Sequence, residues 1–360
     1  EYVFRGAGGL DSRALSDAMD REGVSRSVRP GAMRMTFGAT MLVDRFDAGM
    51  PLVLSMMRSP AMPEDALEAV RSLCLQAIES LEDDPQHLVM LRLAERAVPA
   101  PFNRHGYGRP EAIAAMDAAG LQDAWRRRCV PGGSIIAVAG GIEAEAAFDR
   151  MERWLEGWTG TIAEPAEIAP PIRGIQAIEQ ETAQVHIALG WDGVPERHPD
   201  AMREKLAIAI LSGGSSGRLF TEVRQKRSLC YSVGASFSAG RDRGLVSLYA
   251  GTTPERAQET LDVSLAEIRR LAEGFSDEEH ARAVVGMKSR IVMQGESTPA
   301  RASALASDQY RIGRPRSLEE RLAAVDAVSA EDLRRYVADR EIGPVSMVTI
   351  GPRPLEMPAV

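Results

Sequence analysis

Several features that define common functional classes are scarce or absent in this sequence. Its 360 residues include only three cysteines and five histidines, with no Cys-x-x-Cys pair and no two histidines within four residues of each other. These spacings exclude a disulfide framework, a thiolate metal site and a helical two-histidine metal site. The chain also lacks an apolar run of about 18 residues, so it predicts no membrane-spanning helix.

The overall charge points to no special partner. The formal net charge is −8, and 44% of the residues are hydrophobic and 26% charged, as is usual for a globular protein. No basic patch predicts a nucleic-acid partner. High Arg, Ala and Gly usage is typical of a GC-rich bacterial gene. The chain starts at Glu1 without a methionine, so the compartment stays open between cytoplasm and periplasm.

An internal repeat predicts two duplicated domains. Residues 13–28 align with residues 218–233, and residues 135–140 resemble residues 346–351. The triplet at 38–40 similarly resembles the one at 250–252. Self-similarity at such a long period indicates a duplicated domain rather than a solenoid. Each half mixes strands with runs of helices, so the predicted fold class is α+β.

The proposed division is an N-terminal domain at 1–161, a linker at 162–171 and a C-terminal domain at 172–360. The linker has no hydrophobic periodicity and contains three prolines. In the first half, Asp11 is the expected cap of a helix, 33–42 a strand and 134–139 a buried strand. In the second half we expect strands at 176–178, 184–190, 230–237, 245–251 and 345–350, and helices at 199–211, 254–271, 277–293, 298–311, 317–325 and 330–339.

The stretch 213–233 carries the strongest chemical signal. A Gly/Ser turn precedes an amphipathic pattern at 218–227, which predicts a short helix with Ser215 or Ser216 as its N-cap. Arg224 lies near the end of that helix, and Tyr231 lies in the strand that follows. A guanidinium and a phenol are both hydrogen-bond donors, so together they suit a substrate carbonyl or an oxyanion.

This stretch resembles the C-terminal-domain signature of the insulinase/pitrilysin family of zinc peptidases, which includes the mitochondrial processing peptidases. The resemblance implies two similar domains, each a mostly antiparallel sheet covered by helices, that form a half clam-shell. It also implies that Arg224 and Tyr231 reach toward a zinc centre in another domain and help to hold the substrate. The first repeat has Met19 and Arg26 at the equivalent positions, so folding does not require the pair in both repeats.

The same resemblance locates the family's zinc site near the start of the chain. Active members carry H-x-x-E-H there, and the two His bind zinc while the Glu activates water. Here Glu1 matches that base, Tyr2 stands where the second His should be, and the first His would precede residue 1. The third ligand position falls on Ala77. Three protein ligands are the working minimum for catalytic zinc, so we expect no metal in this chain and zinc in a partner subunit.

With these departures, the resemblance implies the zinc-less, substrate-binding subunit of a heterodimeric peptidase that acts on peptides and is inactive alone. A non-catalytic structural or peptide-binding homodimer of the same fold is the alternative, since core subunits of respiratory complexes resemble this family. A self-sufficient peptidase with a shifted metal site ranks last, because it needs ligands outside the sequence.

Overall fold

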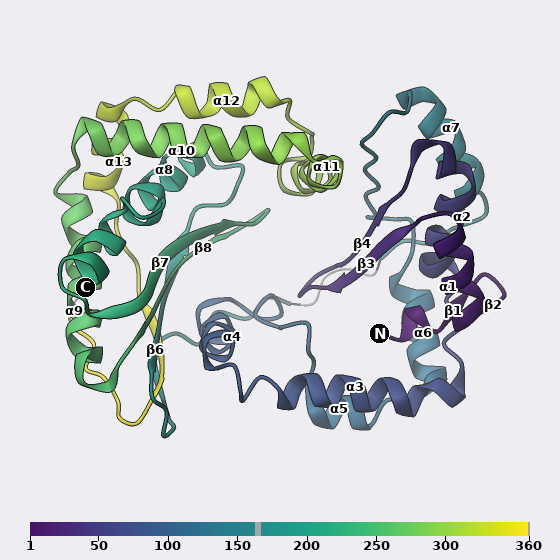
Figure 1. Cartoon of the computed structure of the whole chain (residues 1–360), viewed down its shortest axis with the longest axis horizontal. Helices are drawn as coiled ribbons and strands as arrows, with labels where there is room; N and C mark the ends of the chain where they lie inside the picture. The colour runs from purple at the N-terminus through teal and green to yellow at the C-terminus, as the bar shows by residue number, and fades with distance from the viewer. Residues whose placement is uncertain (163–166, 359–360) are drawn as a thin grey trace. The chain divides into compact units, whose positions relative to one another are not determined.

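The computed structural model describes residues 1–162 and 167–358, which form two compact units (Figure 1). The first unit comprises Glu1–Asp83, Arg104–Glu167 and Thr298–Ala306, and the second comprises Asp84–Asn103, Ile168–Ser297 and Ser307–Val360. The predicted α+β class is confirmed. The domain limits at 161 and 172 stay a prediction, and residues 163–166 of the expected linker lie outside the described residues.

The first unit is mainly helical, with two small antiparallel sheets, β1–β2 and β3–β4. Its core gathers the buried side chains of Tyr2, Leu15, Met19 and Met56. Asp11 caps the first helix as predicted, because its Oδ1 accepts the Ala14 N–H at 2.8 Å.

The elements of the first unit are η1 (Tyr2–Phe4), β1 (Gly6–Ala7), β2 (Leu10–Asp11), α1 (Ser12–Arg21), β3 (Ser25–Pro30), β4 (Met35–Thr40), η2 (Val43–Arg45), α2 (Phe46–Arg58), η3 (Glu64–Ala66), α3 (Leu67–Glu79), α5 (Pro110–Ala114), α6 (Ala118–Arg128) and α7 (Ala144–Leu155).

The prediction of a buried strand at 134–139 is wrong. This segment forms no ladder with any described strand, and Ile135 and Ile136 are 39% and 37% exposed. Its apolar run has the composition of a strand, but a strand needs a partner whose backbone groups complete the ladder. None of the described residues of the first unit supplies that partner.

The second unit contains a five-stranded sheet of order β5-β9-β6-β8-β7. Only the β5–β9 pair is parallel, so the predicted mostly antiparallel sheet is confirmed. All expected strands and helices of this half are present, with ends shifted by a few residues. They are β5 (Ile175–Glu179), β6 (Val185–Gly193), α8 (Ala201–Ser212), the π-helical turn η4 (Phe220–Gln225), β7 (Cys230–Ala239), β8 (Gly244–Thr252), η5 (Pro254–Arg256), α9 (Ala257–Ala272), α10 (Asp277–Glu296), α11 (Thr298–Ile312), α12 (Leu318–Asp326), α13 (Ala330–Asp339) and β9 (Ser346–Gly351).

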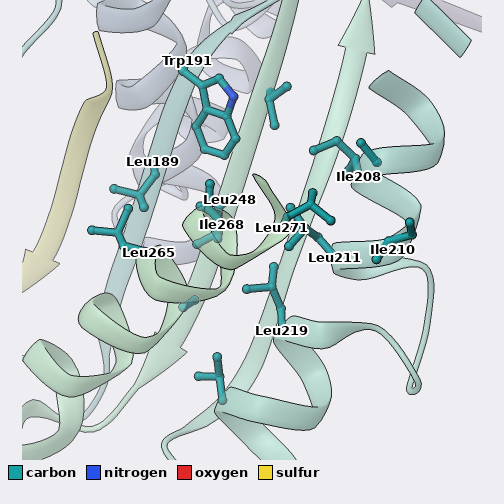
Figure 2. Close-up of a cluster of buried hydrophobic side chains, with 14 of the residues drawn as sticks. Leu189, Trp191, Ile208, Ile210, Leu211, Leu219, Leu248, Leu265, Ile268 and Leu271 are labelled. Atoms are coloured by element: carbon teal, nitrogen blue, oxygen red, sulfur yellow. The ribbon is translucent and has the colours of Figure 1, made fainter. Parts of the chain in front are cut away.

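One face of this sheet packs against helices α8 and α9. Leu189 and Trp191 of β6 meet Leu211 of α8 and Leu265 of α9 in a continuous apolar cluster (Figure 2). Successive side chains of a strand alternate between the two faces, which is why every second residue of β6 enters this cluster. The cluster also holds Leu219, at the start of the segment that carries Arg224.

The opposite face of the sheet is covered by helix α4 (Pro85–Ala97), which lies far upstream in the sequence. Val89 and Leu93 of α4 pack against Ala188 of β6 and Val348 of β9. Gly190 allows this close approach, since a Cβ there would lie 3.2 Å from the Leu93 side chain. The five-stranded sheet of the second unit is therefore covered by helices on both faces.

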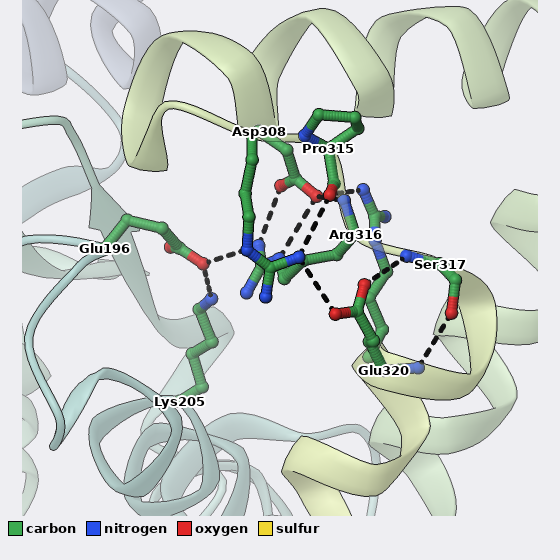
Figure 3. Close-up of polar contacts among 9 residues, drawn as sticks. Glu196, Lys205, Asp308, Pro315, Arg316, Ser317 and Glu320 are labelled. Atoms are coloured by element: carbon green, nitrogen blue, oxygen red, sulfur yellow. Dashed lines mark hydrogen bonds and ion pairs between the residues drawn. The ribbon is translucent and has the colours of Figure 1, made fainter.

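A buried ionic network joins the α11–α12 connection to the rest of the second unit (Figure 3). Arg316 contacts Asp308 at 2.7 Å and Glu196 at 3.0 Å, while Lys205 also contacts Glu196 at 2.6 Å. Arg321 contacts Asp308 at 2.8 Å. Burial alone would raise the pKa of Asp308, but the hydrogen bonds and charges of Arg316 and Arg321 outweigh it, so the pKa lies below its usual value.

Candidate functional site

The segment that carries Arg224 is a helix with a widened turn. It begins at Arg218 and passes into the π-helical turn η4, where the Lys226 N–H donates to the Thr221 carbonyl at 2.9 Å. The predicted helix is present, but it begins directly after Gly217, so neither Ser215 nor Ser216 occupies the N-cap position expected of it. Single π-helical turns occur mostly as inserted residues, frequently at functional sites.

Buried residues on one side fix this helix to the second unit. Leu219 and Val223 are fully buried in the apolar core. Arg218 donates to both carboxylate oxygens of Glu279, at 2.6 and 2.9 Å, and to the Gly274 carbonyl. Such a bidentate pair fixes orientation as well as contact. The helix therefore holds its exposed face in a defined position.

This anchor gives the protein a pH-dependent stability. The hydrogen bonds from Arg218 lower the pKa of Glu279 to about 2 against the burial of the carboxyl, and the backbone N–H of Ser276 adds to the effect. A lowered folded-state pKa contributes stability above about pH 4.5 that is lost as the pH falls toward 2. We expect Glu279→Gln to be less stable than wild type at pH 7, with the difference shrinking toward pH 2.5.

Thermal unfolding of both proteins across this pH range tests the expectation. Glu278→Gln is the matched control, because the Glu278 carboxylate is 81% exposed and Arg282 is its one ion-pair partner among the described residues. A constant difference in Tm between wild type and Glu279→Gln at all pH values would contradict the assignment.

Arg224 differs from the basic residues next to it. Lys226 and Arg227 both pair with the carboxylate of Glu222, at 2.7 and 2.9 Å. Arg224 is exposed and has no ion pair among the described residues, and its guanidinium lies 5.0 Å from the centre of the Phe220 ring. A stacked guanidinium keeps its N–H donors at its edges. Arg224 is thus oriented while its donors remain open to another molecule.

Tyr231 is turned outward by an irregularity in strand β7. The pairing register with β8 shifts between Cys230 and Ser232, so Tyr231 is an extra residue and is 58% exposed. Bulges of this type redirect a side chain away from its regular face. Tyr231 has no hydrogen bond among the described residues, which leaves its hydroxyl available to another molecule.

A tight turn connects the helix that carries Arg224 to the strand that carries Tyr231. Ser228 has a φ of 53°, and the Leu229 N–H donates to the Val223 carbonyl at 3.0 Å. Burial raises the pKa of the Cys230 thiol to about 11, and the nearby charge of Arg224 partly opposes this rise. The guanidinium therefore lies in the neighbourhood of the residue that precedes Tyr231. Arg224 and Tyr231 therefore project from one short, anchored segment that leads into the start of β7.

The first-unit residues of the predicted site do not form a metal centre. Tyr2 is 7% exposed in the core, and its hydroxyl donates to the Pro63 carbonyl at 2.7 Å. Burial raises the pKa of the Tyr2 hydroxyl, and the negative charges of Asp65 and Glu64 raise it further. Glu1 is exposed ahead of η1 and Ala77 is exposed on α3, where its methyl group offers no ligand atom.

The residues present therefore do not fit a catalytic zinc ion. A neutral phenol that is already hydrogen-bonded and a methyl group replace two ligands, and zinc needs three protein ligands in a catalytic site. Across 1–162 and 167–358, no cluster of three or more His, Cys, Asp and Glu side chains could hold a metal.

Sequence reasoning missed the supporting residues of the site. Glu222 forms ion pairs with Lys226 and Arg227. Its spacing to Lys226 is the i,i+4 signal of a helical ion pair. That signal could have been found, although it does not say which cation stays unpaired. The contact between Arg218 and Glu279 spans two distant segments, so local spacing could not reveal it.

Comparison with known proteins supports the predicted family. Residues 116–287 match the family described as the peptidase M16 inactive domain. An uncharacterized zinc protease of Streptomyces coelicolor is 26% identical over 366 residues, which cover 97% of this chain and 79% of that protein. A peptidase M16 inactive domain from Pseudomonas fluorescens has the same fold, with a TM-score of 0.83 and 20% identity over 99% of this chain and 88% of that one.

A chain of complex III2 from Candida albicans is also similar, with a TM-score of 0.79 and 18% identity over 94% of this chain and 86% of that one. Together the matches show that this chain is similar to M16-type zinc proteases, in agreement with the predicted resemblance. In the described parts of the chain, no helix is both long and apolar enough to span a membrane.

Proposed function

We propose that this chain is the zinc-less, substrate-binding subunit of a heterodimeric M16-type peptidase. Arg224 and Tyr231 donate hydrogen bonds to the backbone of an extended peptide, and a partner subunit supplies the zinc. The observation that carries the proposal is the exposed pair of donors on one anchored segment, neither of which is used by the fold.

The chemistry of the two donors suits this role. A peptide backbone presents carbonyl oxygens, and a carbonyl under attack develops negative charge on its oxygen. A fixed guanidinium and a phenol hydroxyl stabilise such charge without reorganising at the moment of reaction. Neither residue is suited to activate water, so catalysis needs another group, which we assign to the partner subunit.

The first prediction from this proposal concerns metal. We expect the purified chain to contain no stoichiometric zinc, because the Tyr2 phenol stays neutral and hydrogen-bonded to Pro63, and Ala77 offers no ligand atom. Elemental analysis after dialysis, together with thermal unfolding with and without a chelator, measures this. One zinc per chain, or a Tm that falls when chelator is added, would contradict the prediction and favour a shifted metal site.

A structural or peptide-binding homodimer remains the second candidate. The match to a family described as inactive and the similarity to a chain of complex III2 favour it. The two candidates differ in partner: a heterodimer forms only with a zinc-bearing relative, whereas a homodimer forms from the chain alone. Mass measurement of the purified chain, alone and mixed with a zinc-bearing relative encoded beside it, distinguishes them.

A further inference from the structure

A row of polar side chains crosses the five-stranded sheet directly beside Tyr231. One cross-strand row contains His186 of β6, Gly251 of β8 and Ser232 of β7. Tyr249 precedes Gly251 by two residues on β8, so its side chain projects from the same face of the sheet. The Tyr249 hydroxyl lies 2.9 Å from the Nδ1 atom of His186. The row ends at Ser232, which directly follows Tyr231 in the sequence.

Gly251 leaves the space that the Tyr249 hydroxyl occupies. A Cβ atom at Gly251 would lie 2.7 Å from this hydroxyl oxygen and 3.4 Å from the Oγ atom of Ser232. Burial raises the pKa of Tyr249, while a hydrogen bond with Ser232 opposes that rise. The hydroxyl therefore lies over the backbone of β8 and connects β6 to the start of β7.

The side chains on which this connection depends are themselves held in place. His186 is 8% exposed, and its ring lies 6.1 Å from the ring of Tyr249. The Tyr249 ring packs against the apolar cluster that Val89 and Leu93 of α4 form with the sheet. A side chain fixed by packing and by a hydrogen bond can hold a neighbouring residue in a defined position.

The first repeat provides an internal comparison. Three positions of its hairpin β3–β4 correspond to this site: Arg26 to Tyr231, Phe37 to Tyr249 and Ala39 to Gly251. In β3–β4 the pairing is regular, and Arg26 pairs directly with Ala39. In the second unit Gly251 pairs with Ser232 instead, and Tyr231 is the extra residue of the bulge. The bulge thus occurs in the repeat that has a hydroxyl with a glycine beneath it, and not in the repeat that has Phe and Ala.

We propose that Tyr249 is a positioning residue for Tyr231. Its hydroxyl, held by His186 over Gly251, fixes Ser232 and with it the bulge that turns Tyr231 outward. Bulges are a common means of redirecting a side chain next to a functional site. The contact of Tyr231 with substrate rests on the function proposed above, whereas the position of Tyr231 is a property of this chain alone.

Fluorine NMR of the full chain with 3-fluorotyrosine only at position 231 measures this position directly. Tyr249→Phe removes the hydroxyl and nothing else, and Gly251→Ala displaces it through the added Cβ. In both variants we expect the Tyr231 resonance to shift and broaden relative to wild type, because the bulge no longer has one fixed conformation. A role of Tyr249 in stability alone would lower the Tm of Tyr249→Phe without moving this resonance.

Ser247→Ala is the matched control. The Ser247 hydroxyl lies 3.0 Å from that of Ser236, so it connects β8 to β7 farther along the same two strands. Its loss should leave the Tyr231 resonance at the wild-type position. An unchanged resonance in both Tyr249→Phe and Gly251→Ala would overturn the proposal. An equal shift in Ser247→Ala would also overturn it, because any contact between β7 and β8 would then suffice.

Activity with the proposed partner gives a second readout. Tyr249→Phe should lower kcat/KM about tenfold, because displacement of a positioned group by about 1 Å can cost up to about 100-fold. The double variant with Tyr231→Phe should be no slower than Tyr231→Phe alone, since Tyr249 acts through Tyr231. Losses that multiply in the double variant would show that Tyr249 acts elsewhere. Wild-type activity of Tyr231→Phe would reject the proposed function, and the fluorine resonance would still decide whether Tyr249 positions Tyr231.

Discussion

Replacing Arg224 by Ala, or Tyr231 by Phe, is expected to lower kcat/KM of the assembled peptidase about 100-fold. Each change removes one preorganised donor to the substrate, and loss of one such donor typically costs 10² to 10³ in rate (about 3 to 4 kcal/mol). Arg224→Lys should restore only part of the activity, because an ammonium lacks the planar fork of donors. The assay mixes the chain with the zinc-bearing partner that we propose and follows cleavage of an unfolded peptide.

A matched control makes this experiment specific. Arg241 is also exposed, pairs loosely with Asp242 at 3.9 Å and lies in the turn between β7 and β8. Arg241→Ala should keep wild-type activity, and all variants should keep the wild-type Tm. Wild-type kcat/KM in both Arg224→Ala and Tyr231→Phe would rule out a role for the pair. Activity of the chain alone that a chelator does not affect would reject the heterodimer as well.

Arg316→Met is expected to destabilise the second unit by about 3 kcal/mol. The change leaves Asp308, which is 4% exposed, with Arg321 as its remaining cation, and Glu196, which is 6% exposed, with Lys205 alone. Removing one partner of a buried ion pair costs several kcal/mol because the other charge stays in a medium of low polarity. Denaturant unfolding monitored by tryptophan fluorescence measures the loss, since Trp191 lies in the core of the same unit.

An exposed pair is the control for this effect. Arg335 contacts Glu331 at 3.4 Å, and the two side chains are 64% and 85% exposed. Arg335→Met should therefore change the free energy of unfolding by less than about 0.5 kcal/mol. Similar losses in the two variants would mean that the network around Arg316 contributes no more than an exposed pair. Replacement of Arg316 by Lys, which keeps the charge but loses the fork, should fall between them.

The second half of the fold was predicted well because its signals are local. Short apolar, β-compatible runs predicted the strands, and longer apolar segments predicted the helices. The structure adds local signals that the prediction did not use, such as the capping boxes of Ser276 and Ser317. The position of α4 was not predicted. Its apolar stripe shows that Val89 and Leu93 are buried, but it does not show that they cover a sheet that begins about 90 residues later.

The candidate site shows the same limit. Residue types and spacing identified Arg224 and Tyr231, but the π-helical turn and the shifted register of β7 depend on how the backbone packs. For the segment 134–139, composition predicted a strand, whereas the outcome depended on whether a partner strand is present. Sequence thus indicates what a segment can form, and its neighbours decide whether it does.

The position of β9 has a consequence for biosynthesis. Residues Ser346–Gly351 form a strand inside the sheet, between β5 and β6, although they follow the other four strands of this sheet in the sequence. Until these residues leave the ribosome, β5 has no paired neighbour and one edge of β6 is unpaired. Helix α4 can then pack against β6 but not against β9. The sheet of the second unit therefore cannot complete its strand pairing until residue 351 has left the ribosome.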